Sequence, residues 1–218
     1  MKRFTQTLAI LVCGFVLTSC DYIFPSSWNY RITVEIETPE GVKSGSAVRE
    51  VQAVLQPKIT PETHPISYGT LGEAVVVDLG ERGVVFALIS SESYNEVYKA
   101  FPSSVRTNKE RIQYYSSLTK GKKTELKTSL PWLATFTDRT NPLSLTGVDR
   151  LNMDKTFGEG VKFKRITIEM TDDPVTWGVV DKYLPKSFKS VLVDGWMNLE
   201  KEQKNRLYLL MGFKKGEK

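Results

Sequence analysis

Residues 30–37 alternate strictly between apolar and polar side chains, and this pattern constrains the fold more than any other stretch of the chain. The apolar members are Tyr30, Ile32, Val34 and Ile36. Successive residues of a strand point to opposite faces of a sheet, so the segment predicts a half-buried strand. A turn at residues 39–41 follows, and residues 42–55 predict a return strand with a bulge between Val48 and Val51. The sequence therefore predicts that the domain opens with an antiparallel hairpin.

Two further segments, 74–79 and 84–89, predict a second hairpin. Both are nearly continuous apolar runs, and the four residues between them, Gly-Glu-Arg-Gly, suit a short turn. Apolar runs without alternation indicate strands that are covered on both faces. We therefore expect these two strands at the centre of the sheet.

Two amphipathic helices are predicted in the middle of the chain. Ser93 and Glu96 have the spacing of a capping box, and apolar residues with helical spacing follow until Pro102. A second capping box is formed by Thr107 and Glu110. The apolar side of the second helix carries Ile112, Tyr115 and Leu118. Because each helix has one apolar face, both should pack on a sheet.

The second half of the chain predicts more strands and one short helix. The strand-like segments are 132–137, 161–171, 189–196 and 206–213. Asp173 followed by Pro174 has the chemistry of a helix start, and that helix should end at Pro185. Residues 143–160 are irregular, with three expected inward-facing anchors: Val148, Leu151 and Phe157. Together these elements predict an α+β fold, a largely antiparallel sheet with a few amphipathic helices packed on it.

The first twenty residues have the layout of a secretory signal. Lys2 and Arg3 precede a mostly apolar run, and small residues then lead to Cys20. The run is too short for a transmembrane helix, which needs about 20 apolar residues. The ending Leu17-Thr18-Ser19-Cys20 resembles the lipobox of bacterial lipoproteins, in which the cysteine is lipidated and becomes the first residue of the mature chain. An ordinary cleaved signal peptide has no need of a cysteine at this point.

This resemblance implies a lipid anchor and a cellular location. Acyl chains such as palmitate on Cys20 would hold the protein in a membrane. In many Gram-negative bacteria an aspartate after the lipidated cysteine opposes export to the outer membrane, and Asp21 stands there. The resemblance therefore implies the periplasmic side of the inner membrane, with the outer membrane as the alternative.

The expected division of the chain into segments follows from the predicted signal peptide and lipidation site. Residues 1–19 are the signal peptide that is removed, and residues 20–27 are the lipidated N-terminus with a short linker. Residues 28–213 form a single globular domain, and residues 214–218 form a basic tail. The linker spans at most about 25 Å when extended, so the domain should work close to the bilayer.

The composition of the chain argues against several chemistries. The two cysteines, Cys13 and Cys20, lie in the leader and at the lipidation site, so the domain has none for a disulfide, a nucleophile or a metal. The single histidine, His64, lies in a proline-rich loop, and the chain has no Gly-x-Ser-x-Gly motif. We therefore expect no cofactor and no metal site. Without Lys2 and Arg3 the net charge falls from +5 to +3, 28 basic residues against 25 acidic, which does not favour nucleic acid as a partner.

Candidate functional residues come from two groups. Trp132, Trp177 and Trp196 are candidates for a ligand or partner surface, with core packing as the alternative. Trp28 follows the linker directly and is a candidate for a residue at the membrane interface. The candidate acidic site of a hydrolase consists of Asp138, Asp172 and Asp173. The basic clusters at 120–123 and 214–218 are either solvated or in contact with anionic lipid headgroups.

The segment from Leu130 to Val175, with Thr135-Phe136-Thr137-Asp138 and Thr171-Asp172-Asp173-Pro174, resembles uncharacterised proteobacterial lipoproteins and exported proteins. The resemblance implies no particular activity. We expect a non-enzymatic, membrane-tethered binding module whose partner is a protein or an envelope component. An envelope hydrolase that uses the carboxylates and an immunity lipoprotein against a periplasmic toxin are the two alternatives.

Overall fold

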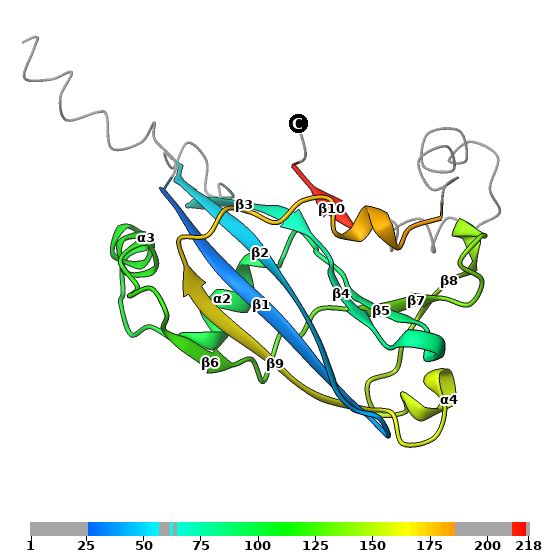
Figure 1. Cartoon of the computed structure of the whole chain (residues 1–218). Coiled ribbons are helices and arrows are strands. Elements are labelled where there is room, and N and C mark those ends of the chain that lie inside the picture. Colours follow the sequence, from blue (N-terminus) through cyan, green and yellow to red (C-terminus); the bar gives the residue numbers. More distant parts are fainter. Residues whose placement is uncertain (1–25, 57–61, 63–64, 186–210, 217–218) are drawn as a thin grey trace, which may run out of the picture.

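A computed structural model of the protein describes residues 26–56, 62, 65–185 and 211–216. Within these residues the chain forms two antiparallel sheets with helices packed beside them (Figure 1). The predicted α+β class is confirmed. No helix in these ranges is long and apolar enough to cross a membrane.

The larger sheet is built around the predicted opening hairpin. Its strand order is β10-β3-β2-β1-β9-β6. Its strands are β1 (Ser26–Thr38), β2 (Gly41–Leu55), β3 (Ile66–Glu73), β6 (Lys123–Glu125), β9 (Lys162–Thr171) and β10 (Lys214–Lys215). β1 and β2 pair along their whole length, from Ser26 opposite Ala53 to Thr38 opposite Gly41, so the predicted hairpin is confirmed.

The bulge predicted between Val48 and Val51 is wrong, because the register of β1 and β2 is unbroken. Val48 and Arg49 point to opposite faces of β2, yet both are buried. Burial of Val48 on one face and of Val51 on the other looks, in the sequence, like a break in the alternation of apolar and polar residues, which is the pattern of a bulge. The backbone of Val48 exchanges two hydrogen bonds with Thr176, of 2.8 and 3.0 Å. The segment around Thr176 therefore lies against β2 at this point.

The second predicted hairpin forms, but its expected place at the centre of one sheet is wrong. It belongs to a separate sheet of order β4-β5-β7-β8, with β4 at the edge. The elements are β4 (Val75–Asp78), η2 (Gly80–Arg82), β5 (Val84–Ala87), β7 (Leu133–Phe136) and β8 (Leu145–Gly147). The predicted strand at 132–137 is thus confirmed as β7.

The smaller sheet is covered on both faces, which explains its continuous apolar runs. One face joins the main core, in which Val75, Val77 and Val85 lie with side chains of β1, β2 and the helices. The other face forms a second cluster, whose members include Val84, Phe86, Phe136, Val180 and Phe213.

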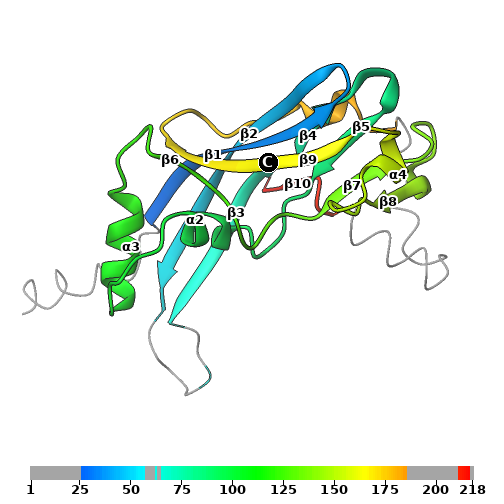
Figure 2. The same cartoon turned by 90° about the horizontal axis from the view of Figure 1, so that it is seen from below.

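Two helices occupy the predicted positions and lie on one face of the larger sheet (Figure 2). They are α2 (Tyr94–Ala100) and α3 (Asn108–Ser116). The Thr107–Glu110 capping box is confirmed, with reciprocal bonds of 3.1 and 3.2 Å. The Ser93–Glu96 capping box is wrong: Ser93 makes no side-chain cap bond, and Glu96 is buried.

The helix predicted after Pro174 is also wrong, because only the 3-10 turn η4 (Val180–Lys182) forms there. Asp173 does not cap a helix; its carboxylate instead accepts hydrogen bonds from Arg31 and from the Thr171 hydroxyl. Two more short elements are η3 (Pro142–Ser144) and α4 (Asp154–Phe157).

The remaining expectations for the second half have mixed outcomes. The strand at 161–171 is confirmed as β9. Val148 and Phe157 are buried as expected, whereas Leu151 is 92% exposed. Residues 186–210, which include the predicted strand at 189–196, lie outside the described residues. Residues 211–213 form a turn rather than a strand, and Lys214 and Lys215 pair with β3.

We predict that Gly45→Ala destabilises the domain by about 1–3 kcal/mol, because β2 and β4 approach too closely for a side chain. A Cβ atom at Gly45 would lie 1.8 Å from the carbonyl oxygen of Val76. Urea unfolding followed by tryptophan fluorescence measures the loss. Gly147→Ala in β8 is the matched control, since no atom lies within 4 Å of a Cβ there. Equal losses in both variants would contradict the close contact.

Candidate functional site

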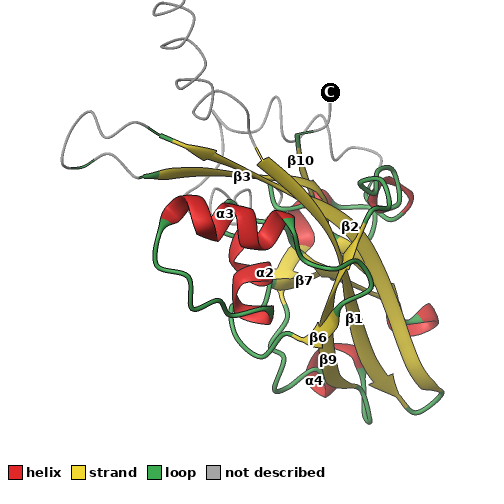
Figure 3. Cartoon of the chain, turned by 90° about the vertical axis from the view of Figure 1, so that its left-hand side faces the viewer, coloured by secondary structure: helices red, strands yellow, loops and turns green. Residues whose placement is uncertain are grey.

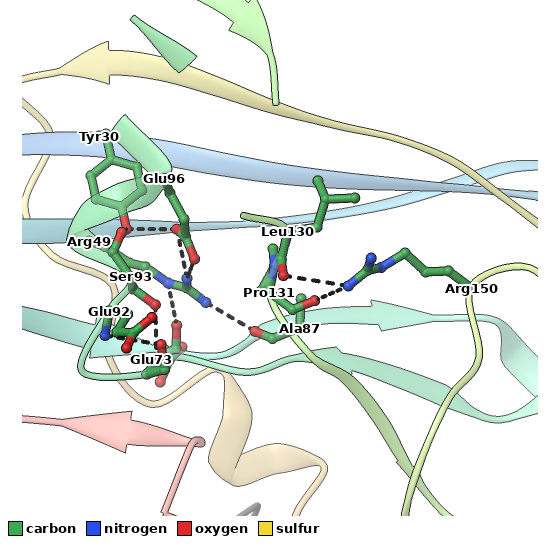
Figure 4. Close-up of polar contacts among 11 residues, drawn as sticks. Tyr30, Arg49, Glu73, Ala87, Glu92, Ser93, Glu96, Leu130, Pro131 and Arg150 are labelled. Atoms are coloured by element: carbon green, nitrogen blue, oxygen red, sulfur yellow. Dashed lines mark hydrogen bonds and ion pairs between the residues drawn. The ribbon is translucent and has the colours of Figure 1, made fainter. Parts of the chain in front are cut away.

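Arg49 is a fully buried charged residue that connects β2 to both sheets and to α2. Its Nη1 donates to both carboxylate oxygens of Glu96, each at 3.0 Å. Its Nε donates to the carbonyl oxygen of Glu73 at 3.2 Å, and its Nη2 to that of Ala87 at 3.0 Å. Figure 4 shows the guanidinium between these partners. A single side chain therefore fixes β3, β5 and α2 relative to β2.

Tyr30 completes the surroundings of the buried Glu96 carboxylate. The Tyr30 hydroxyl donates to Glu96 at 2.8 Å and lies 3.3 Å from the carbonyl oxygen of Ser93. Burial and the adjacent Glu96 charge raise the pKa of Tyr30 well above its ordinary value, so the hydroxyl remains a donor. Glu96 thus has both a cation and a phenol as partners, which compensates for its loss of water.

Glu73, at the end of β3, is a second buried carboxylate. Its Oε1 accepts a hydrogen bond of 3.0 Å from the backbone N–H of Val179. Burial raises the pKa of Glu73, while backbone N–H groups of residues 178–180 oppose the rise. Its Oε2 is buried and has no hydrogen-bond partner among the described residues. Glu73 therefore fastens the segment before η4 to the larger sheet.

Arg150 binds the backbone of residues 130 and 131 from the side opposite Arg49 (Figure 4). Its Nη2 donates to the carbonyl oxygens of Pro131 at 2.6 Å and Leu130 at 3.5 Å. The carbonyl oxygen of Trp132 accepts a hydrogen bond of 2.9 Å from the N–H of Leu88. The backbone before and at Trp132 is therefore fixed on both sides.

A cavity of about 230 Å³ lies between the end of β5, the loop into α2 and residues 129–132; we call it the Trp132 cavity. Its polar and aromatic lining includes Ser90, Glu92, Glu96, Ser129 and Trp132. Trp132 is 72% exposed, although tryptophan is highly buried on average. Ser129 has φ 54°, a left-handed conformation that is costly for residues other than glycine and is concentrated at functional sites. The cavity thus combines an exposed aromatic ring with carboxylates and hydroxyls.

The structure separates the candidate tryptophans. Trp132 lines the cavity, whereas Trp177 is 37% exposed and does not line it. Trp28 is buried against Tyr98 and Tyr115, so its predicted place at the membrane interface is wrong. Trp196 lies outside the described residues, as do Cys20, Asp21 and His64.

The three candidate aspartates do not come together in one cavity. Asp138, after β7, accepts bonds of 2.8 and 2.7 Å from the N–H and hydroxyl of Thr140, which lower the pKa of Asp138. Asp172 pairs with Lys120 at 3.0 Å, and Asp173 pairs with Arg31. None of the three lines the Trp132 cavity. Within the described ranges, no group of three or more His, Cys, Asp or Glu side chains is placed to hold a metal ion.

Comparison with known proteins gives no relative: no family model, no curated protein and no solved structure matches this chain. The resemblance of residues 130–175 to exported proteins therefore stays a prediction. Function must be inferred from the geometry of the chain itself.

Arg49, Glu73 and Glu96 were not predicted as site residues. A signal for Arg49 is present in β2, where it shares the inward face with Ala47, Val51 and Ala53. An arginine within such an apolar alternation requires a buried acid, because an unpaired buried charge is very costly. The sequence did not single out Glu96 as a buried ion-pair partner, because its three-residue spacing from Ser93 also fits a capping box.

We predict that Arg49→Met costs about 3–5 kcal/mol of unfolding free energy, because it leaves the Glu96 carboxylate buried without its cation. The double variant Arg49→Met with Glu96→Leu should lose less than Arg49→Met alone. Urea unfolding of the wild type and of each variant measures the losses. Arg165→Met removes the partly exposed Arg165–Glu35 pair and serves as the control, with an expected cost of about 0–1 kcal/mol. A double variant less stable than Arg49→Met would contradict this account.

Proposed function

We propose that the protein is a lipoprotein, anchored through Cys20 on the periplasmic side of the inner membrane, that binds a partner protein through the Trp132 cavity. One observation carries the binding proposal: an exposed tryptophan on a fixed backbone beside a cavity. Tryptophan is among the residues most enriched in the hot spots of protein interfaces. The lipobox and Asp21 support the anchor and the address.

A second exposed apolar side chain beside the cavity supports an interaction surface. Met211 is 57% exposed and precedes Gly212, whose carbonyl oxygen accepts a bond of 2.7 Å from Ile89. Trp132 and Met211 thus place an exposed ring and an exposed thioether side chain on two segments that border the same cavity.

The charges around the cavity favour a basic side chain of the partner. Glu96 is neutralised by Arg49, but Glu92 is exposed and has no ion-pair partner among the described residues. A lysine or arginine that enters the cavity would meet the Glu92 carboxylate and the ring of Trp132. Cations are attracted both to a carboxylate and to the face of an indole ring.

The short tether limits which partners the site can reach. β1 begins at Ser26, six residues after Cys20, and six extended residues span at most about 21 Å. A domain held in this way would meet proteins that are themselves embedded in the membrane or held at its surface. The separate positions of the three aspartates give the alternative of a carboxylate hydrolase no comparable support.

We expect radiolabelled palmitate to enter the wild-type protein and not the Cys20→Ala variant, because the acyl chains require the Cys20 thiol. Immunoprecipitation after labelling in a bacterial host measures the incorporation. Cys13→Ala is the matched control and should retain the label, since Cys13 lies in the leader. Equal labelling of Cys20→Ala and the wild type would overturn the anchor.

We expect Trp132→Ala to lower the recovery of the cross-linked partner about tenfold or more, because truncation of a hot-spot tryptophan commonly costs at least 2 kcal/mol of binding. The measurement is cross-linking in cells followed by quantitative mass spectrometry. Trp177→Ala is the matched control, since Trp177 is partly exposed but lies outside the cavity. Glu92→Gln should lower recovery of the partner less than Trp132→Ala does. Its effect should be larger at low ionic strength than at high ionic strength, because salt screens the charge. Unchanged recovery with Trp132→Ala would show that the cavity is not the binding site.

A further inference from the structure

A second cavity, of about 620 Å³, is lined by residues of β3, α2 and α3. Figure 3 shows these three elements next to one another. We call it the tyrosine cavity; its lining includes Ser67, Tyr68, Tyr94, Asn108 and Arg111. The rings of Tyr68 and Tyr94 are stacked, with centroids 4.2 Å apart and an interplanar angle of 11°. Its volume is within the range of small-molecule sites.

Arg111 supplies this cavity with a positive charge that pairs with no carboxylate of the described residues. Its side chain is half-buried, and no carboxylate lies within ion-pair distance of it among the described residues. Glu62 also lines the cavity but does not pair with Arg111. Burial raises the pKa of Tyr68, and the neighbouring Tyr98 hydroxyl and Arg111 guanidinium oppose that rise. Guanidinium groups of this kind bind carboxylates and phosphates through paired hydrogen bonds.

Further aromatic rings pack behind the stacked Tyr68 and Tyr94. Tyr98 packs edge-on against Tyr68 and Tyr94, with centroid distances of 5.6 and 5.9 Å. Tyr98 also lies 4.1 Å from Tyr115, and Trp28 contacts both. This packing holds the stacked pair in place, so it offers a fixed apolar surface to the carbon skeleton of a ligand.

The cavity lies at the end of the domain where the chain enters. β1 begins beside α3 (Figure 2), and Ser26 at its start pairs with Ala53 near the end of β2. If Cys20 is anchored as proposed above, this end lies next to the bilayer. The lysines of the two basic clusters are less suited to headgroups, since three of them already pair with carboxylates: Lys120, Lys123 and Lys214.

We propose that the tyrosine cavity binds an anionic phosphate ester, carried by a phospholipid headgroup or by soluble glycerol phosphate. Arg111 holds the phosphate, and the stacked Tyr68 and Tyr94 cover the carbon skeleton. The phospholipid source rests on the proposed anchor at Cys20, whereas the phosphate chemistry does not.

Isothermal titration of the full chain in a neutral detergent tests the site. The ligands are dihexanoyl phosphatidylglycerol, below its micelle concentration, and glycerol 3-phosphate. We expect saturable binding that weakens about tenfold or more in Arg111→Gln, because a charge-assisted hydrogen-bond pair is lost. Arg111→Lys should retain part of the affinity. Arg106→Gln is the matched control, since Arg106 is exposed just before α3 and does not line the cavity.

Each outcome decides between the sources or against the site. Tighter binding of phosphatidylglycerol than of glycerol phosphate supports a headgroup site, and equal binding supports a site for soluble phosphate esters. Absence of saturable binding, or equal binding by Arg111→Gln and Arg106→Gln proteins with unchanged thermal midpoints, overturns the proposal. Palmitate labelling of Cys20 is measured independently, so failure of the anchor and failure of this site remain distinguishable.

Discussion

The buried ion pair between Arg49 and Glu96 is the interaction on which the arrangement of sheets and helices depends. Arg49 must meet a carboxylate and two carbonyl oxygens that come from different elements, and only one relative placement of β2, β3, β5 and α2 satisfies all of them. A buried pair of this kind adds little net stability compared with apolar side chains, yet a misplaced partner would leave a charge without compensation. Its effect is therefore to exclude other packings of α2.

The strands form two separate sheets because segments far apart in the sequence pack against both faces of the smaller sheet. Glu73 fastens the segment before η4 through the N–H of Val179, and Thr176 bonds with the backbone of Val48. That segment leads into η4, whose first residue, Val180, packs on the outer face of the smaller sheet. The inner face meets β2 where Gly45 leaves room for the backbone of Val76. The carboxylate of Glu73 and the absence of a Cβ atom at Gly45 thus allow the smaller sheet to be covered on both faces.

Local patterns predicted the elements whose structure is decided locally. The alternation of residues 30–37 and the capping box at Thr107 correspond to a strand and a helix start. The same reasoning failed at Asp173-Pro174, where the aspartate binds Arg31 from a neighbouring strand instead of capping a helix. Trp132 was among the predicted candidates, but Trp28 shows that residue type alone does not distinguish an exposed ring from a buried one. The Trp132 cavity itself joins segments more than 30 residues apart, so no local pattern predicts it.

α2 relates the two cavities to each other. Tyr94 lines the tyrosine cavity, and Glu96 lines the Trp132 cavity. Two residues correspond to about 200° around a helix of 3.6 residues per turn, so these side chains leave α2 in nearly opposite directions. A seven-residue helix has little stability of its own, and its position depends on tertiary contacts. Because the pair with Arg49 fixes Glu96, it also fixes the tyrosine on the opposite side, and one buried ion pair sets the geometry of both candidate sites.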